Sequence, residues 1–177
     1  MIIRSRSPLR ISMGGGGTDL PEYFYKHSGC VINATIDKYA YCTLERTTNT
    51  SDVSFVASDL GVSRKYPLAK VLESNVPQEL VLHLAVYKYF VREYGGGQPV
   101  PLKLTTYCDA PLGSGLGSSS AMTVSLIRCF TELYKIPADN YFLAELAIKI
   151  ERIDAKLPGG QQDQYAASFG GFNFIEF

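Results

Sequence analysis

The stretch "PLGSGLGSSSAM", residues 111–122, places three glycines and four serines between two segments of different pattern. Before it, residues 101–110 ("PLKLTTYCDA") have the composition of a β-strand. After it, apolar side chains recur at helical spacing as far as Tyr134. A glycine-rich turn at a helix N-terminus lets backbone N–H groups approach a phosphate closely. A flexible turn before an ordinary capped helix has the same pattern, so the stretch alone leaves both interpretations open.

The rest of the chain reads as strands and helices on either side of this loop. Residues 2–13 alternate apolar and polar side chains and end in four glycines, which predicts a strand followed by an open turn. Residues 29–47 and 52–58 are rich in β-branched and aromatic residues, and we expect them to be antiparallel strands. Helices are predicted from Pro77 to the glycines at 95–97, from about Ser119 to Tyr134, from an N-cap at Asp139 to Ile150, and from about Gln161 to Ser168. Residues 170–177 are predicted to form a final strand.

Composition narrows the class of protein. At 177 residues the chain fits one domain, with 17 basic and 17 acidic residues and a formal net charge of zero. A basic face for nucleic acid is therefore not expected. Without an apolar run of about 18 residues or a secretory signal, we expect no membrane partner and a cytoplasmic location. The cysteines are widely spaced and are predicted to be buried free thiols, without a disulfide or a zinc site: Cys30, Cys42, Cys108 and Cys129.

Three segments together resemble one family. The spelling "PLGSGLGSSSA" resembles the P-x-x-x-G-L-G-S-S-A-A signature of the GHMP kinases, with Ser120 in place of the usual alanine. Residues 8–20, "PLRISMGGGGTDL", look like the N-terminal motif of the same family. Residues 159–171, "GGQQDQYAASFGG", resemble the segment that carries its catalytic aspartate. The three matches follow the family's order and approximate spacing.

The resemblance implies an α+β fold, in which residues 1–177 form the N-terminal, ATP-binding lobe of a two-lobed kinase. Such a lobe pairs a sheet with a layer of helices, as in ribosomal-protein-like folds. The third family motif, a glycine-rich stretch of the C-terminal lobe, is not in this sequence, so the C-terminal lobe is absent and the chain is expected to be truncated. Apolar residues crowd 172–177, and we expect such surface to be covered by something downstream or to cause self-association.

Within the family, the sequence of these motifs looks most like that of the D-glycero-α-D-manno-heptose 7-phosphate kinases. The implied reaction is ATP-dependent phosphorylation of the anomeric hydroxyl to the 1,7-bisphosphate, for nucleotide-activated heptose synthesis. Fucokinase-type enzymes share much of the motif sequence, and a fucokinase-type or other sugar 1-kinase is the alternative. Gly16 and Gly17 replace the Glu-His pair of galactokinases and argue against that activity. A nucleotide-binding fragment without catalysis and an RNA binder of similar fold are the other classes considered.

The resemblance also assigns ATP and Mg²⁺ to particular residues. The nucleotide phosphates would lie on the glycine-rich loop, at Pro111, Gly113, Ser114, Gly115, Leu116, Gly117, Ser118, Ser119 and Ser120. Ser119 and Glu151 would hold Mg²⁺, a hard cation that takes hydroxyl and carboxylate oxygens. Without the resemblance, Glu151 beside Arg152 reads as a solvated charge pair.

Asp163 and Arg10 are the predicted catalytic residues. Asp163 would accept the proton of the attacking sugar hydroxyl, and Arg10 would stabilise charge on the transferring phosphoryl group. A helix-capping aspartate and a surface ion pair are the competing interpretations.

The predicted sugar site lies in the N-terminal motif. Gly16 and Gly17 would leave room for a ligand against the backbone. Thr18 and Asp19 would bind sugar hydroxyls, although a turn-forming aspartate fits the same residues.

Overall fold

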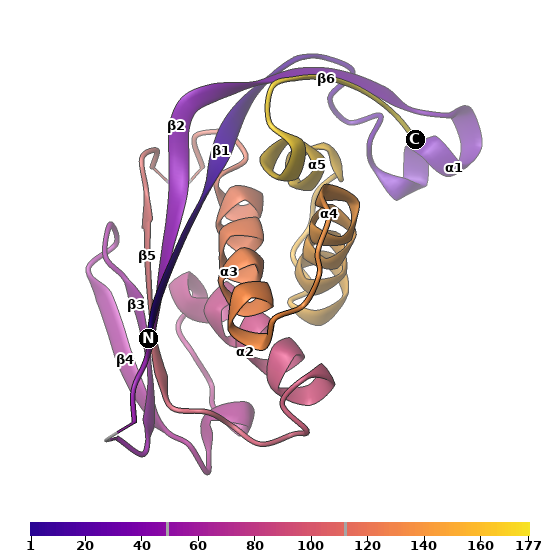
Figure 1. Ribbon diagram of the computed structural model, residues 1–177. Coiled ribbons are helices and arrows are strands. Elements are labelled where there is room, and N and C mark those ends of the chain that lie inside the picture. The colour runs from indigo at the N-terminus through magenta and orange to yellow at the C-terminus, as the bar shows by residue number, and fades with distance from the viewer. Residues whose placement is uncertain (49, 112) are drawn as a thin grey trace.

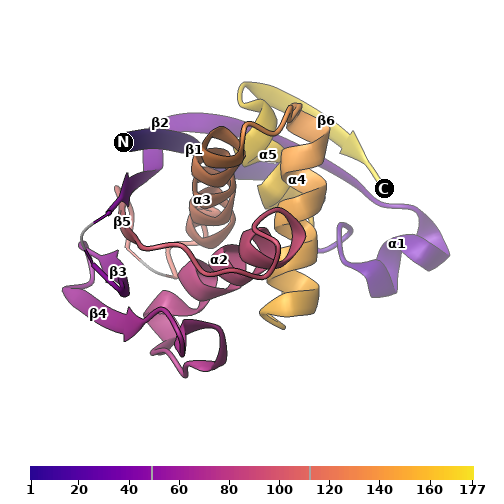
Figure 2. The same ribbon diagram turned by 60° about the horizontal axis from the view of Figure 1, so that its bottom comes forward.

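The computed structural model describes residues 1–48, 50–111 and 113–177, so Leu112 of the glycine-rich loop lies outside the described residues. One sheet and a layer of helices make up the described part, with α2 to α5 against one face of the sheet (Figures 1 and 2). The strands are β1 (Ile2–Gly14), β2 (Cys30–Arg46), β3 (Asp52–Ala57), β4 (Val62–Pro67), β5 (Leu102–Cys108) and β6 (Phe172–Glu176). The helices are α1 (Pro21–His27), α2 (Val81–Glu93), α3 (Ser118–Tyr134), α4 (Asn140–Ile148) and α5 (Gln162–Phe169). The predicted α+β lobe is confirmed.

The sheet has the order β1-β2-β5-β3-β4, and β6 pairs with the N-terminal part of β2. The expectation that residues 29–47 and 52–58 form antiparallel strands holds for their existence but not for their pairing. β5 lies between them, antiparallel to β2 and parallel to β3. The antiparallel partner of β3 is β4, which the sequence did not indicate. β4 is an edge strand with three exposed residues in a row, 63–65, so it lacks the alternation of a half-buried strand.

The core lies between the sheet and helices α2 and α3. Phe55 of β3 packs edge-on against Tyr87 of α2, with ring centroids 5.9 Å apart. Phe90 of α2 stacks on Phe130 of α3 at 5.0 Å. The hydroxyl of the buried Tyr87 donates to the carbonyl of Val100, so its polar end is satisfied. These contacts fix α3, and with it the loop that precedes α3.

The predicted end signals of the helices agree with the structure in part. Asp139 caps α4, because its Oδ1 accepts from the Phe142 N–H at 2.8 Å. Two short 3₁₀ turns, Val71–Glu73 and Gln78–Leu80, precede α2. After α4 the chain continues as a π-helical turn, Lys149–Asp154, in which the Ala155 N–H donates to the carbonyl of Ile150. The helix α1 was not predicted from the sequence.

Three of the four cysteines are buried as expected, and all four are free thiols. The prediction is wrong for Cys30, which is exposed, because β2 begins in an arm of the sheet whose outer face has no cover. His83 is buried against Thr106, and burial lowers the pKa of its imidazole to about 4. No helix among the described residues is both long and apolar enough to cross a membrane.

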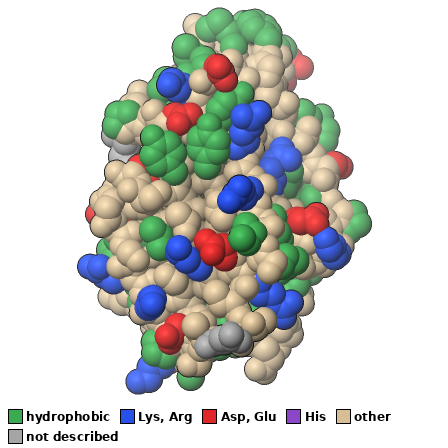
Figure 3. Space-filling model, turned by 60° about the vertical axis from the view of Figure 1, so that its left-hand side comes forward, with side chains coloured by type: hydrophobic (Ala, Val, Ile, Leu, Met, Phe, Trp, Pro, Cys, Tyr) green, Lys and Arg blue, Asp and Glu red, His purple; other side chains and the backbone are tan. Residues whose placement is uncertain are grey.

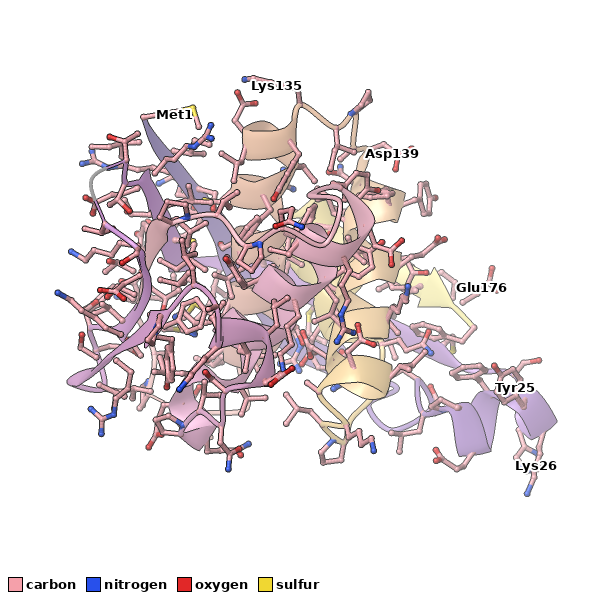
Figure 4. The ribbon with its side chains drawn as sticks, turned by 90° about the horizontal axis from the view of Figure 1, so that it is seen from below. Met1, Tyr25, Lys26, Lys135, Asp139 and Glu176 are labelled. Carbon is pink, nitrogen blue, oxygen red and sulfur yellow. The ribbon has the colours of Figure 1, made fainter. Side chains whose placement is uncertain are left out.

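The long strands β1 and β2 bend over the helices and form an arm with β6, and α1 projects at its end (Figure 1). Tyr25 and Lys26 of α1 point into solvent at this corner, near Glu176 (Figure 4). On the outer face of the sheet, basic and acidic side chains are interspersed (Figure 3). The arm, the start of α5 and the glycine-rich loop bring distant parts of the sequence to one place.

Candidate functional site

The glycine-rich loop ends in a helix N-terminus with free donors. Gly113, Gly115 and Gly117 have φ values of +78°, +73° and +75°, a conformation that side chains disfavour. Gly117 is the residue before α3, and no side chain of the described residues caps the first N–H groups of that helix. These donors and the helix dipole favour an anion at this point. The loop is fixed to the arm, because the Arg10 N–H donates to the carbonyl of Leu116.

An apolar cavity of about 280 Å³ opens beside the loop. Ser118 and Ser119 form the wall nearest the loop, and Met122 belongs to the next turn of α3. Its other lining residues include Leu60, Leu82, His83 and Thr106. Sequence reasoning missed this cavity, because its walls come from five segments whose spacing along the chain carries no common signal.

Asp163 lies in the first turn of α5 and is held by Arg10. The guanidinium Nε of Arg10 donates to Asp163 Oδ1 at 2.7 Å, and Nη2 lies 2.5 Å from the same oxygen. Nη1 of Arg10 donates to the carbonyl of Gly115, so one guanidinium joins β1, α5 and the loop. Burial raises the pKa of Asp163, Arg10 lowers it, and the nearby Asp19 raises it further. The competing interpretation of Arg10 as a surface ion pair is wrong, because only 11% of its side chain is exposed.

The loop and Asp163 are in direct contact through a glycine. A Cβ at Gly117 would lie 3.3 Å from Asp163 Cγ and 3.5 Å from Arg10 Cγ. A side chain at position 117 would press on Asp163, and φ at this residue is +75°, which side chains disfavour. The absence of a side chain therefore brings the carboxylate to the helix N-terminus where an anion would sit.

Glu151 is a buried carboxylate at the first residues of the π-helical turn. Its Oε2 accepts from Ser120 Oγ and from Gln164 Nε2, both at 3.0 Å, while Oε1 has no partner among the described residues. Burial raises the pKa of Glu151, and the adjacent Arg152 opposes the shift. The solvated charge pair is thus not what the structure has, since Glu151 is 1% exposed.

The Mg²⁺ prediction can be compared with this donor set. The structure pairs Glu151 with Ser120, and Ser119 is exposed one residue earlier, towards the apolar cavity. The described residues hold no group of three or more His, Cys, Asp or Glu side chains that could ligate a metal. Mg²⁺ in nucleotide sites usually takes one or two carboxylates and completes its shell with phosphate oxygens and water. A buried carboxylate with one free oxygen fits that requirement.

Asp19 and Thr18 make internal bonds in the structure. Asp19 is 3% exposed, and its two oxygens accept from the N–H groups of Gly17 at 3.0 Å and Gln162 at 3.1 Å. Thr18 Oγ1 donates to the carbonyl of Gly15 and accepts from the Cys30 N–H. The aspartate therefore closes the turn and fixes the first residue of α5. A Cβ at Gly16 would lie 3.7 Å from Ser12 Oγ and 3.9 Å from Gln162 Nε2, which are ordinary contact distances.

The order of the strands and helices and the glycine-rich loop before α3 can be compared with known families. The sequence matches the profile described as the GHMP kinases N-terminal domain over residues 79–171, more than half of the chain, and the chain belongs to this family.

Several of the similar proteins are sugar or sugar-phosphate kinases by name. The chain is 41% identical to D-glycero-alpha-D-manno-heptose 7-phosphate kinase of Campylobacter jejuni, over 99% of this chain and 50% of that protein. It is 42% identical to a solved D-glycero-D-manno-heptose 1-phosphate kinase of Bacteroides thetaiotaomicron, with a TM-score of 0.91, covering 100% of this chain and 56% of that one. It is 25% identical to the bifunctional fucokinase/GDP-fucose pyrophosphorylase of Arabidopsis thaliana, over 94% of this chain and 16% of that protein. The chain thus spans about half the length of the two heptose kinases.

Proposed function

We propose that this chain is the ATP-binding lobe of a kinase that phosphorylates a hydroxyl of a sugar or sugar phosphate. The observation that carries the proposal is the contact of Asp163 with the anion-binding end of α3 across Gly117. A proton acceptor and a phosphate site must lie side by side for a hydroxyl to attack a phosphoryl group. An RNA-binding role gains no support from the interspersed charges on the outer face of the sheet.

In the proposed reaction the side chains have separate tasks. Asp163 orients the sugar hydroxyl and accepts its proton as the oxygen attacks the γ-phosphate. Arg10 keeps that carboxylate in place and offers positive charge to the transferring group. The raised pKa of Asp163 suits a base, because it increases the affinity of the carboxylate for the proton.

ATP would bind along the glycine-rich loop, with its base in the apolar cavity. Ser118 and Ser119 line the cavity and also begin α3. A nucleotide could therefore place its base in the cavity and its phosphates at the start of α3. Glu151 and Ser119 would hold Mg²⁺, which when bound neutralises phosphate charge. The free Oε1 of Glu151 is the oxygen that supports this assignment.

The proposed substrate is D-glycero-D-manno-heptose 7-phosphate, phosphorylated at its anomeric hydroxyl to give the 1,7-bisphosphate. The names of the two heptose kinases share this sugar and differ in the phosphate position. Gly16, Gly17, Thr18 and Asp19 would shape the sugar side of the site, Asp19 by holding the turn. A fucokinase-type activity is the alternative. The reaction is proposed for the cytoplasm, where ATP is supplied.

The first test is titration calorimetry of the 177-residue chain with Mg²⁺–ATP. We expect binding that Ser119→Ala weakens about tenfold, equivalent to ~1.4 kcal/mol. Ser51→Ala, an exposed serine outside the loop, is the matched control and should bind as the wild type does. Equal binding by both variants would contradict the assignment of Ser119.

The second test uses the full-length protein, with ADP release as the readout. The acceptors are heptose 7-phosphate, heptose 1-phosphate, unphosphorylated heptose and fucose. The proposal predicts the highest kcat/KM for heptose 7-phosphate. A preference for fucose would select the alternative.

A further inference from the structure

Arg152 spans the loop that joins the two carboxylates of the site. Its Nη1 donates to the carbonyls of Leu157 at 3.3 Å and Pro158 at 3.2 Å, and its Nη2 donates to the carbonyl of Gly160 at 2.7 Å. About 20% of the side chain is exposed. Three carbonyls of a four-residue loop thus converge on one guanidinium. The planar fork of arginine can serve such a set, whereas the point charge of lysine cannot.

The same guanidinium is bound to one of the site's carboxylates. Nη1 of Arg152 lies 3.3 Å from Glu151 Oε2, the oxygen that also accepts from Ser120 and Gln164. The charge of Arg152 lowers the pKa of Glu151 and that of Asp163. Arg152 therefore acts on both ends of the segment 151–163.

Two glycines let the loop pass between Arg152 and Asp19. A Cβ at Gly159 would lie 3.0 Å from Arg152 Nη2, and φ at this residue is +139°. A Cβ at Gly160 would lie 1.9 Å from Asp19 Oδ2. Asp19 also accepts from the first N–H of α5, the helix that carries Asp163. The loop is thus held between a cation on one side and a carboxylate on the other.

We infer that Arg152 is a positioning residue that fixes the loop 157–160 and so sets the placement of Asp163 relative to Glu151. The catalytic meaning of this inference rests on the proposed function. The contacts of Arg152 with the loop 157–160 and with Glu151, which we call the clamp, do not depend on it. Arg152 contacts the loop carbonyls and Glu151, and it acts on catalysis only through the carboxylates that it places. A charge pair at the surface would not require three carbonyl contacts.

The test in the 177-residue chain is limited proteolysis at Lys156 with endoproteinase Lys-C, which cuts after lysine and is unaffected by loss of an arginine. We expect Arg152→Gln and Arg152→Met, neither of which adds a Lys-C site, each to speed cleavage at Lys156 at least tenfold, because neither keeps the guanidinium fork. Arg128→Gln is the matched control: Arg128 is also partly buried and donates to a carbonyl, that of Ser168, at the other end of α5. Unchanged cleavage in both Arg152 variants, or equal opening in the control, would overturn the clamp. If Arg152→Gln does not fold by circular dichroism, Arg152→Met, whose unbranched apolar side chain fits a partly buried place, decides the question.

The test of positioning uses the full-length protein. We expect Arg152→Lys to lower kcat about tenfold or more with little change in the Kd for ATP, and to shift the acidic limb of the pH profile of kcat/KM. Wild-type kcat and pH profile in Arg152→Lys would show that positive charge is enough and would overturn the positioning role. A full-length wild-type protein without kinase activity on any acceptor would refute the proposed function. The Lys-C experiment would still show whether Arg152 holds the loop 157–160.

Discussion

Arg10 and Asp163 form an ion pair between residues 153 positions apart in the sequence, with an Nε–Oδ1 distance of 2.7 Å. The pair fixes the start of α5 to the middle of β1. Because Arg10 also binds the carbonyl of Gly115, the same contact sets the position of the glycine-rich loop. Each part of the site is thus held by another part of the site, and the predictions below test those links.

Asp163→Asn removes the proposed proton acceptor but keeps a side chain of the same shape. In the full-length protein we expect turnover to fall at least about a hundredfold, the loss typical of a missing general base, while ATP affinity is preserved. Steady-state kinetics and nucleotide titration measure the two quantities. If turnover is unchanged, Asp163 has a structural role alone.

Glu151→Gln should raise the stability of the chain at neutral pH. Burial raises the pKa of Glu151 above its ordinary value of 4.5 in the folded state, so the wild type loses stability as pH rises through the unfolded and then the folded pKa. Glutamine removes the buried charge, and the two proteins should become equally stable below the unfolded pKa. Thermal unfolding from pH 4 to pH 8 measures this difference.

Glu145→Gln on the exposed side of α4 is the control for Glu151→Gln. It should follow the wild-type Tm across the pH range. A Glu151→Gln protein that is less stable than the wild type at every pH would contradict the prediction. A stabilised but inactive full-length variant would instead fit a carboxylate kept for function at a cost in stability.

Gly160→Ala should destabilise the chain by about 1–3 kcal/mol, the cost of forcing extra atoms into a packed place. The new methyl group would overlap the carboxylate of Asp19, so the loop or the aspartate must move. Gly14→Ala is the matched substitution, because nothing lies within 4 Å of a Cβ there and its backbone, like that of Gly160, is not left-handed. Urea unfolding compares the two. Equal losses of unfolding free energy in the two variants would show that Asp19 moves aside at no cost, and would contradict the prediction.

The outer face of the arm predicts self-association of the isolated chain. Ile32 is the cross-strand partner of Phe174, and Ile11 lies in one row with Ala34 and Phe172. The two phenylalanines are 59% and 71% exposed, which is a large apolar surface for a soluble protein.

Sedimentation of the 177-residue chain measures that association. We expect Phe174→Asp to shift the chain towards monomer at concentrations where the wild type associates. Tyr25→Asp, at the similarly exposed tip of α1, should not do so. A wild-type chain that stays monomeric at high concentration would refute the prediction.

The sequence predicted the elements whose signals are local. The loop before α3 follows from its glycines, and the N-cap at Asp139 follows from a residue type that bonds three positions ahead. In each case the deciding interaction lies within a few residues.

The remaining features depend on partners far along the chain. The pairing of β3 with β5 requires a crossover that no short window contains. Which of the three serines reaches Glu151 depends on the rotation of α3 against the π-helical turn, and that rotation is set by packing. The contacts of Arg152 with three carbonyls could not be predicted either, because every residue carries a backbone acceptor and the sequence does not show which ones a side chain reaches.

The π-helical turn at 149–154 has a consequence for chain length. Such a turn holds one residue more than the α-helix around it would, and one residue corresponds to about 100° of rotation around a helix axis. We expect deletion of Lys149 to remove this extra residue and to move Glu151 and Arg152 one position towards α4, out of their present contacts with Ser120 and the loop, with every site residue still present. The site therefore depends on the number of residues in this turn as well as on their identity.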